Sequence, residues 1–236
     1  MQVRVNDSST MPDYDQEKRG AAEYSVRFIE DGMAVGLGSG STASHFIRSL
    51  GDRVRNGLRI RAIPTSERSG ELARESGIEL TDFGRIDQLD VTVDGADEID
   101  PDLNLIKGGG GALLREKIVA SATRRLIIIG DSRKRVATLG AFPLPIEVIP
   151  FACELVTRRI RQLCPNVALR TDPQGQPFQT VEGNFILDGS FGTIEDLEGL
   201  ARQLDSMPGV VEHGLFLQMA STVVIARGED IEVEQR

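Results

Sequence analysis

Cysteine and histidine are scarce in this chain of 236 residues, which has two of each. Cys153, Cys164, His45 and His213 cannot supply a Cys₄ or Cys₂His₂ set at zinc-finger spacing. Two cysteines are also too few for a disulfide framework. We therefore expect no metal site and a reducing compartment, most simply the cytoplasm.

Long apolar runs are missing as well. The longest, Leu126–Ile129, falls far short of the roughly 18 residues that a membrane-spanning helix needs. Acidic residues outnumber basic ones by 36 to 27, which gives a net charge of −9. A chain with this charge is not expected to have a broad nucleic-acid-binding surface. The composition thus predicts no membrane and no nucleic-acid partner, and an anionic ligand would need a local basic pocket.

The chain does have enough apolar content for a substantial core. Hydrophobic residues make up 40% of it, and a chain of this length buries about 70% of its surface on folding. One large or two modest domains are expected from length alone.

Strand and helix patterns alternate along the first 140 residues. We expect helices over 12–32, 43–51, 67–76 and 112–122, and strands over 34–37, 59–63, 78–80, 90–93 and 126–129. Such alternation predicts an α/β domain with a doubly wound, mostly parallel sheet covered on both faces.

The pattern changes after the proline-rich segment at 142–145. Strands are expected over 146–149, 167–170 and 210–217, a strand or a hairpin broken near 182–184 over 178–187, and helices over 153–163 and 194–204. This β-α-β-β-α-β order predicts a smaller ferredoxin-like α+β domain. We assign residues 13–142 and 218–236 to a Rossmann-like catalytic domain, with 222–226 as an edge strand of its sheet. Residues 143–217 form the ferredoxin-like domain, and residues 1–12 are expected to be a disordered arm.

Three glycine-containing segments follow predicted strands, where open parallel sheets bind ligands. In the first, Gly36–Thr42, glycines permit a sharp turn and the following helix start favours an anion. Serine at 41 breaks a G-x-G-x-x-G dinucleotide motif, and no Gly-Lys-Ser/Thr completes a P-loop. A plain helix N-cap by Ser41 or Thr42 is the alternative to phosphate binding.

The second segment, residues 94–102, contains five acidic side chains, which would ordinarily form a solvated turn. Asp94 and Asp97, however, directly follow a buried strand and should lie at the ligand-binding edge of the sheet. Magnesium binding is a competing interpretation, but glycine in second place does not fit the spacing of an EF-hand.

The third segment runs from Lys107 through four successive glycines to Glu116. Four glycines are entropically costly, and they offer unobstructed amides beside a cation, a suitable place for developing negative charge. Taken alone, Glu116 reads as an ordinary exposed helical residue. Together the three segments suggest proton transfer between neighbouring sugar carbons, which needs a carboxylate base, an oxyanion cradle and a phosphate anchor.

The chain resembles the A-type ribose-5-phosphate isomerases in four segments that occur in the same order. These are GLGSGSTA at 36–43, DGADEID at 94–100, KGGGGALLREK at 107–117 and FPLPIEVIP at 142–150. The resemblance runs from about residue 15 to the C-terminus. It implies interconversion of ribose 5-phosphate and ribulose 5-phosphate in the non-oxidative pentose phosphate pathway, through an enediolate and without a cofactor, by a homodimer or homotetramer.

The resemblance also implies residue roles. Glu116 corresponds to the base that carries a proton between C1 and C2, Asp94 and Asp97 to contacts with substrate hydroxyls, and Lys107 to the oxyanion-stabilising cation. The substrate-binding positions are Ser39, Gly40, Ser41, Thr42, Gly95, Ala96, Gly108, Gly109, Gly110, Lys134 and, with a solvated helix charge as the alternative, Lys18. His213 is interpreted as structural.

Two rival functions remain at this stage. A sugar-phosphate-sensing domain of a transcription regulator would have a similar fold but little reason to keep Glu116, Asp94 and Asp97 together, and solvent deuterium entering the sugar would exclude it. A coenzyme A transferase has similar glycine-rich turns, but it would be inactive on ribose 5-phosphate alone.

Overall fold

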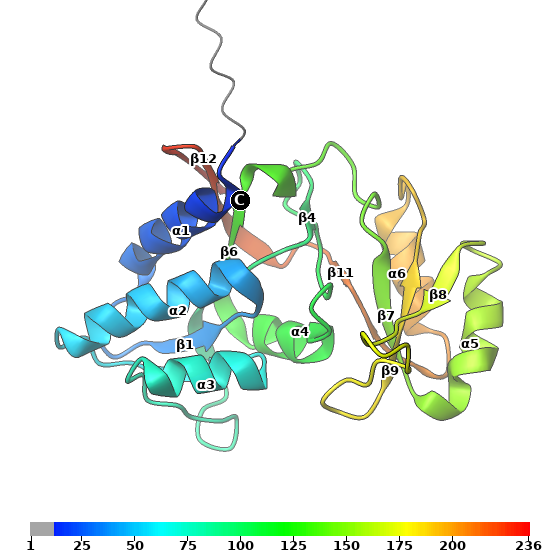
Figure 1. Cartoon of the computed structure of the whole chain (residues 1–236), viewed down its shortest axis with the longest axis horizontal. Coiled ribbons are helices and arrows are strands. Elements are labelled where there is room, and N and C mark those ends of the chain that lie inside the picture. The colour runs from blue at the N-terminus through cyan, green and yellow to red at the C-terminus, as the bar shows by residue number, and fades with distance from the viewer. Residues whose placement is uncertain (1–11) are drawn as a thin grey trace, which may run out of the picture.

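The computed structural model describes residues 12–236 as two α/β units joined side by side (Figure 1). The larger unit has a six-stranded sheet in the order β13-β12-β6-β3-β1-β2. Its strands are β1 Ala34–Leu37, β2 Arg61–Pro64, β3 Leu89–Asp94, β6 Thr123–Asp131, β12 Ala220–Arg227 and β13 Asp230–Gln235. All neighbours pair in parallel except β12 and β13. This is the doubly wound, mostly parallel sheet that the alternating pattern predicts.

Side-chain alternation along the strands gives this sheet two apolar faces. Ile127 and Ile129 of β6 pack into the core under α1 Tyr14–Ser25 and α2 Gly40–Arg55. Ile128 points to the opposite face, into a core that includes Ala120 of α4 Leu113–Ser121. Helices therefore cover both faces, as strands buried on both sides require.

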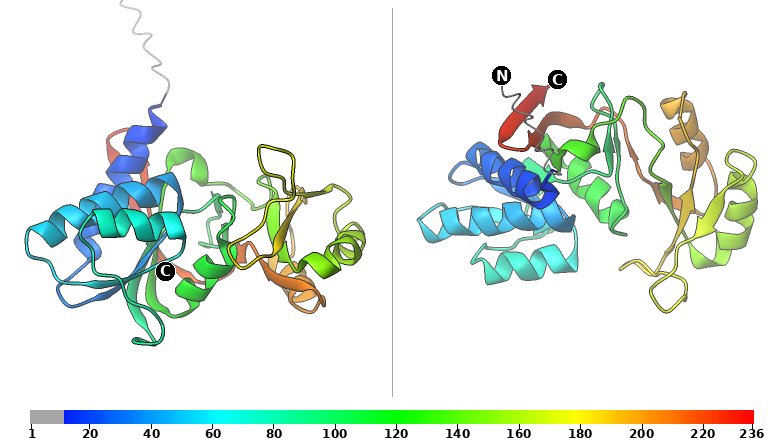
Figure 2. Two further views of the ribbon diagram at one scale, coloured as in Figure 1. Left: turned by 60° about the horizontal axis from the view of Figure 1, so that its bottom comes forward. Right: turned by 45° about the horizontal axis from the view of Figure 1, so that its top comes forward.

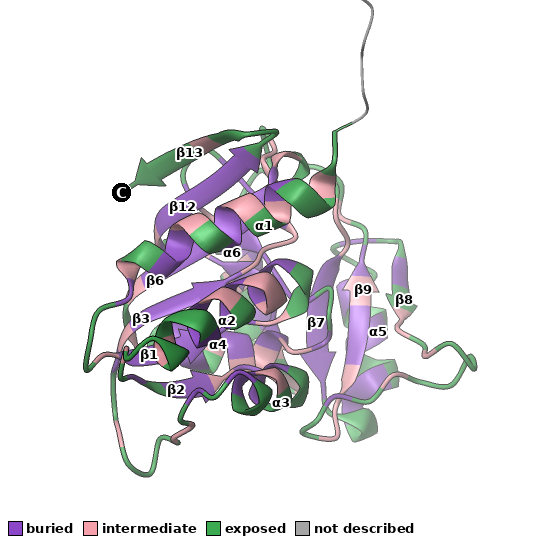
Figure 3. Ribbon diagram, turned by 60° about the vertical axis from the view of Figure 1, so that its left-hand side comes forward, coloured by how far each residue is buried: buried purple, intermediate pink, exposed green. Residues whose placement is uncertain are grey.

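Because helices cover both faces, the central strands of the sheet are buried, whereas β13 at its edge is exposed (Figure 3). The prediction of 222–226 as an edge strand was therefore wrong: β12 lies inside the sheet, with β6 on one side and β13 on the other. Figure 2 shows these C-terminal strands beside α1, which contacts both of them.

Local capping explains where the helices begin. The Asp13 carboxylate accepts the Asp15 and Gln16 amides at 3.1 Å and starts α1. Ser66 caps α3 Glu67–Glu75 through the Ser69 amide at 3.1 Å. The first helix is shorter than predicted, because it tightens into a 3₁₀ turn, η1 Val26–Phe28, before the chain reverses at Gly32, where φ is +84°.

The smaller unit has a four-stranded antiparallel sheet in the order β10-β7-β9-β8. Its elements in chain order are β7 Leu144–Val148, η3 Pro150–Ala152, α5 Cys153–Ile160, β8 Val167–Leu169, β9 Phe185–Gly189, α6 Leu197–Asp205 and β10 Val210–His213. This is the β-α-β-β-α-β order expected for a ferredoxin-like unit. Apolar residues of α5, α6 and the sheet share one core.

A third, three-stranded sheet of order β11-β5-β4 lies between the two units and was not expected from the sequence. It joins β4 Glu98–Ile99, β5 Leu105–Ile106 and β11 Leu215–Phe216. The predicted strand 210–217 is consequently two strands that belong to different sheets. They divide at Gly214, where a Cβ atom would lie 2.3 Å from the Lys107 carbonyl oxygen.

One further predicted strand is reduced in the structure. The strand expected over 78–80 is a single bridge between Leu80 and Ala62, because the chain leaves the sheet edge at once. Another 3₁₀ turn, η2 Ser132–Lys134, follows β6. No helix formed by residues 12–236 has the length and apolar character to cross a membrane.

Candidate active site

The site forms where β1 and β3 end side by side in the larger sheet. Gly38 directly follows β1, and its amide donates to the Val93 carbonyl of β3 at 2.9 Å. A Cβ atom at Gly38 would lie 2.1 Å from Asp94 Oδ1, so this close approach requires glycine. The glycine-rich turn and the acidic segment are thereby held against each other.

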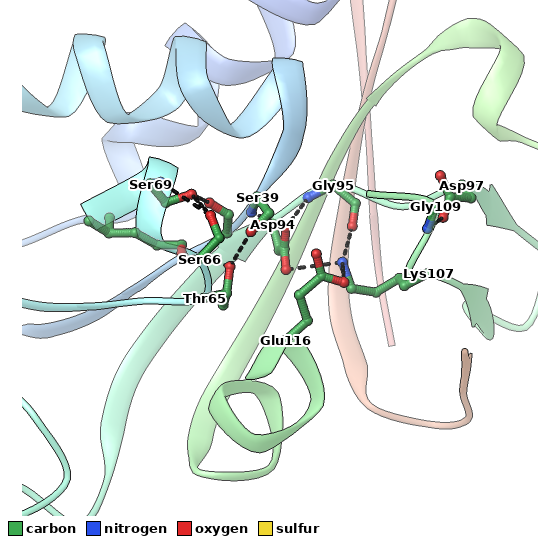
Figure 4. Close-up of polar contacts among 12 residues, drawn as sticks. Ser39, Thr65, Ser66, Ser69, Asp94, Gly95, Asp97, Lys107, Gly109 and Glu116 are labelled. Atoms are coloured by element: carbon green, nitrogen blue, oxygen red, sulfur yellow. Dashed lines mark hydrogen bonds and ion pairs between the residues drawn. The ribbon is translucent and has the colours of Figure 1, made fainter. Parts of the chain in front are cut away.

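Polar side chains that follow β2 support this turn from the other side (Figure 4). The Ser69 hydroxyl donates to the Gly38 carbonyl at 2.6 Å, and the hydroxyls of Thr65 and Ser39 lie 2.7 Å apart. Thr65 and Ser69 were not predicted from the sequence as site residues. Their only signal is their place after a predicted strand, at the same sheet edge as the glycines.

Asp94 is buried and fully engaged. Its Oδ1 accepts the amides of Ser39 at 2.9 Å and Gly95 at 2.7 Å, and its Oδ2 lies 3.0 Å from Lys107 Nζ. Two amides and an ammonium group hold this carboxylate in one orientation. Asp94 thus fixes the position of the Lys107 ammonium group.

Lys107 is the cation at the centre of the cluster (Figure 4). Its Nζ lies 3.0 Å from Asp94 Oδ2 and 3.3 Å from Glu116 Oε2, and all three side chains are buried. Burial lowers the pKa of the Lys107 ammonium, but the Asp94 and Glu116 carboxylates outweigh burial and hold the pKa above its ordinary value. Lys107 therefore carries a proton throughout the neutral range.

Glu116 lies in the first turn of α4 and is only 5% exposed. Its Oε2 has no hydrogen-bond partner among residues 12–236, although it lies within ion-pair distance of Lys107. Burial raises the pKa of Glu116 to about 7, while the Lys107 charge partly opposes that rise. A carboxyl group with such a pKa exchanges its proton readily near neutral pH.

The four glycines after Lys107 form a strip along the same site. Gly108 and Gly111 have φ values of +103° and +84°, which favour glycine. The Gly109 amide donates to Asp97 Oδ2 at 2.8 Å. A Cβ atom at Gly110 would meet nothing within 4 Å, so the strip faces open space there.

These groups line a cavity of about 170 Å³. Every predicted site residue except Asp94 lies in its wall, which consists of Lys18, Ser39, Gly40, Ser41, Thr42, Gly95, Ala96, Asp97, Lys107, Gly108, Gly109, Gly110, Glu116, Arg133 and Lys134. Asp94 lies behind that wall. Arg133 was not predicted from the sequence, where its one indication is its position beside Lys134.

The cavity has a cationic end. Lys18 of α1 and Arg133 and Lys134 of η2 contribute to its wall, as do Ser41 and Thr42 at the start of α2. The Arg133 guanidinium pairs with Asp131, at 2.9 Å from Nε to Oδ1 and 3.1 Å from Nη2 to Oδ2. Lysines beside a helix N-terminus form a favourable site for a phosphate group.

A larger hollow of about 680 Å³ lies elsewhere, between the loop after β4 and the start of α6. Its charged wall residues are Asp102, Glu195, Asp196, Glu198, Glu234 and Arg236. This excess of carboxylates repels an anionic ligand, so charge selects the smaller cavity over the larger one.

His213 lies outside the cavity and is buried. Its Nδ1 accepts the Leu215 amide at 3.2 Å, and its Nε2 lies 3.1 Å from Asp205 Oδ1. Burial and the Lys117 charge lower the pKa of His213 to about 4, so the ring is neutral. Asp205, Glu212 and His213 bring possible metal-ligand atoms together, but Glu212 is already paired with Lys117 at 2.6 Å.

Fold and site together define an enzyme that transfers protons on a small anionic substrate, in the manner of an aldose–ketose isomerase. The family model for ribose 5-phosphate isomerase A (phosphoriboisomerase A) matches residues 61–230. The chain belongs to the ribose 5-phosphate isomerase A family and is an isomerase.

Relatives that match over almost their whole length are also named ribose-5-phosphate isomerases. Ribose-5-phosphate isomerase A of Bradyrhizobium diazoefficiens is 52% identical over 232 residues, which cover 94% of this chain and 96% of the relative. A solved D-ribose-5-phosphate isomerase in complex with phospho-erythronic acid superposes with a TM-score of 0.92 at 38% identity, covering 95% of this chain and all of that one. The Neisseria gonorrhoeae enzyme gives 0.89 at 36% identity, with 95% and 98% covered.

Proposed function

We propose that the cavity interconverts ribose 5-phosphate and ribulose 5-phosphate through an enediolate, with Glu116 as the base that moves a proton between C2 and C1. One observation carries this assignment: a buried carboxyl group with a pKa of about 7 lies beside a buried ammonium and a glycine strip in one cavity. The family membership indicates the substrate, and the geometry of the site supports the roles proposed for its residues.

The steps follow from the charges. The Glu116 carboxylate takes the proton from C2 of the open-chain aldose, and the C–H electron pair moves toward C1 while O1 becomes negative. The Lys107 ammonium and the Gly110 amide of the glycine strip, which borders open space, stabilise that oxygen. Protonated Glu116 then returns its proton to C1, and the C2 hydroxyl proton passes to O1, which gives the ketose.

We assign the hydroxyl-proton step to Asp97. It lies in the cavity wall, and the Gly109 amide fixes its Oδ2 at 2.8 Å. Asp94 was expected to contact substrate hydroxyls too, but its position behind Lys107, with both oxygens engaged, favours an indirect role. We assign Asp94 to holding Lys107 and tuning Glu116.

The phosphate group is proposed to occupy the cationic end of the cavity. Lys18, Lys134 and Arg133 would face it together with the hydroxyls of Ser41 and Thr42. The ligand of the solved relative, phospho-erythronic acid, combines a phosphate with a carboxylate. A cavity with a cationic end and a separate ammonium–amide cradle suits both groups.

The proposed function is tested by the incorporation of solvent deuterium into the sugar phosphate. The protein is incubated with ribose 5-phosphate in deuterium oxide with a chelator and without coenzyme A. We expect ribulose 5-phosphate to form and solvent deuterium to appear on C1 or C2. Binding of the sugar phosphate with neither product nor exchange would indicate a sensing domain instead, and a need for coenzyme A would indicate a transferase.

We further propose a homodimer or homotetramer that uses the ferredoxin-like unit, with the chain divided into domains at 13–142 with 218–236 and at 143–217. Phe151 is 98% exposed, and Ile149 and Leu155 beside it are also exposed. Adjacent exposed apolar side chains of this size favour burial against another chain. A cytoplasmic location is proposed because both cysteines are buried free thiols.

A further inference from the structure

The smaller unit packs Pro145 and Phe178 against the glycine strip and hydrogen-bonds it through Arg170, which follows β8. Its Nη1 donates to the carbonyl of Gly108 at 3.0 Å and to that of Gly109 at 3.1 Å. Its Nε and Nη2 bind the Asp188 carboxylate of β9 at 2.8 and 2.5 Å. The Arg170 side chain is 15% exposed, so the ion pair is shielded from water.

Holding these carbonyls determines where the amides point. In a trans peptide the C=O and the following N–H lie in one plane and point in opposite directions. The Gly109 and Gly110 amides therefore point away from Arg170. The Gly109 amide meets Asp97 in the cavity wall, and Gly110 borders open space in the same wall.

Without Arg170 the strip has two hydrogen bonds among the described residues, from the Gly111 amide to the Gly108 carbonyl at 3.0 Å and from the Gly109 amide to Asp97 Oδ2 at 2.8 Å, and neither engages the Gly109 carbonyl. Glycine has the widest choice of backbone conformations, so consecutive glycines do not fix their peptide planes. A guanidinium bonded to two successive carbonyls removes that freedom. It also polarises the two peptide groups, which strengthens their N–H groups as donors.

We propose that Arg170, oriented by Asp188, is a positioning residue that holds the Gly110 amide toward the developing oxyanion and the Gly109 amide toward Asp97. The proposal rests on the proposed function of the strip. Arg170 itself does not line the cavity and would not touch substrate. Replacing Arg170 should therefore weaken stabilisation of the transition state and leave binding of the phosphate group unchanged.

The experiment compares R170K, R170A and D188N with the wild type in the full chain. Lysine keeps the charge but has no fork to span two carbonyls and Asp188. Removing one oxyanion donor outright costs about 10²–10³ in kcat. Since these variants only misorient donors, we expect kcat to fall by roughly 10- to 100-fold, with KM changed by less than about threefold.

Two inhibitors separate positioning from general damage. The inhibition constant of phospho-erythronic acid should rise with the loss in kcat, while that of inorganic phosphate should stay unchanged. Added guanidinium ion should restore part of the activity of R170A. Arg158→Ala, at an exposed arginine of α5, is the matched control and should match the wild type.

Variants with unchanged kcat, or with both inhibitors weakened equally, would overturn the proposal. A wild type that turns over no ribose 5-phosphate would instead overturn the proposed function, so the two failures are distinguishable. Thermal unfolding of each variant identifies misfolding, and R170K supplies the answer if R170A does not fold.

Discussion

The ammonium nitrogen of Lys107 lies 3.3 Å from Glu116 Oε2, and both side chains are almost excluded from solvent. The two influences on Glu116 oppose each other. Burial raises its pKa because water no longer solvates the carboxylate, and Lys107 lowers it by attraction, with a balance at about 7. The pair thus keeps a carboxyl group in the middle of its titration under neutral conditions.

Glu116→Gln should abolish catalysis while leaving binding largely intact. The amide keeps the shape of the side chain but cannot accept the C2 proton, and general base action contributes about 10²–10⁴-fold. We expect kcat to fall by at least about 10²-fold, with the affinity for ribose 5-phosphate measured by calorimetry nearly unchanged. Glu71→Gln, on an exposed face of α3, is the matched control. Lost binding with normal turnover of the bound fraction would contradict the role of Glu116.

The activity should fall on the acid side because Glu116 acts as a carboxylate. At pH values above its pKa of about 7 the base is ionised and kcat/KM is at its plateau; below it, kcat/KM drops about tenfold per pH unit. The Asp94 charge contributes to raising that pKa, so Asp94→Asn should move the acid limb to lower pH.

Comparing the two pH profiles with one substrate cancels the ionisation of the sugar phosphate itself. Asparagine can still accept the Ser39 and Gly95 amides through its carbonyl oxygen. An acid limb that stays in place or moves upward in Asp94→Asn would show that Glu116 is not the titrating base.

Lys134→Ala and Lys18→Ala should weaken substrate binding more than turnover. Each loses a charge-assisted contact with the proposed phosphate position, and such contacts are worth enough to raise KM by roughly 10-fold or more. Steady-state kinetics and inhibition by inorganic phosphate measure the effect. Arg19→Ala is the control on the same helix as Lys18, since Arg19 is exposed and outside the cavity wall. A KM for Lys18→Ala equal to that of Arg19→Ala would favour a solvated helix charge.

Phe151→Asp should disrupt the proposed assembly without unfolding the subunit. The ring is almost fully exposed in the single chain, so it has little packing to lose there. Light scattering after size exclusion should show a lower mass for Phe151→Asp than for the wild type. Glu154→Gln, at a neighbouring exposed position of α5, should keep the wild-type mass. An unchanged mass in Phe151→Asp would move the interface elsewhere.

Much of the fold could be predicted because the apolar patterns are local and strong. The run at 126–129 marks a buried strand, and Gly77 follows the end of α3, but the prediction that Gly51 ends the second helix was wrong, because α2 continues through it to Arg55. The strand β13 could not be predicted in the same way, because its acidic side chains are exposed and it is held through backbone pairing with β12. Charged edge strands have no apolar face to detect.

The site could be predicted only as far as chain order places groups at one sheet edge. The position of Glu116 in the cavity agrees with that prediction, and so does that of Lys107. The burial of Asp94 behind Lys107 depends on three segments meeting in space. The hydrogen bonds from Arg170 to the glycine strip join two units about 60 residues apart in the chain. No local sequence pattern could therefore predict them.

The placement of β12 beside β6 has a consequence for synthesis of the chain. The smaller sheet uses only residues 144–213, so its pairing does not depend on β12 or β13. Until β12 emerges, one edge of the very apolar β6 has no neighbour. A nascent or prematurely terminated chain therefore exposes a strand that is prone to aggregate.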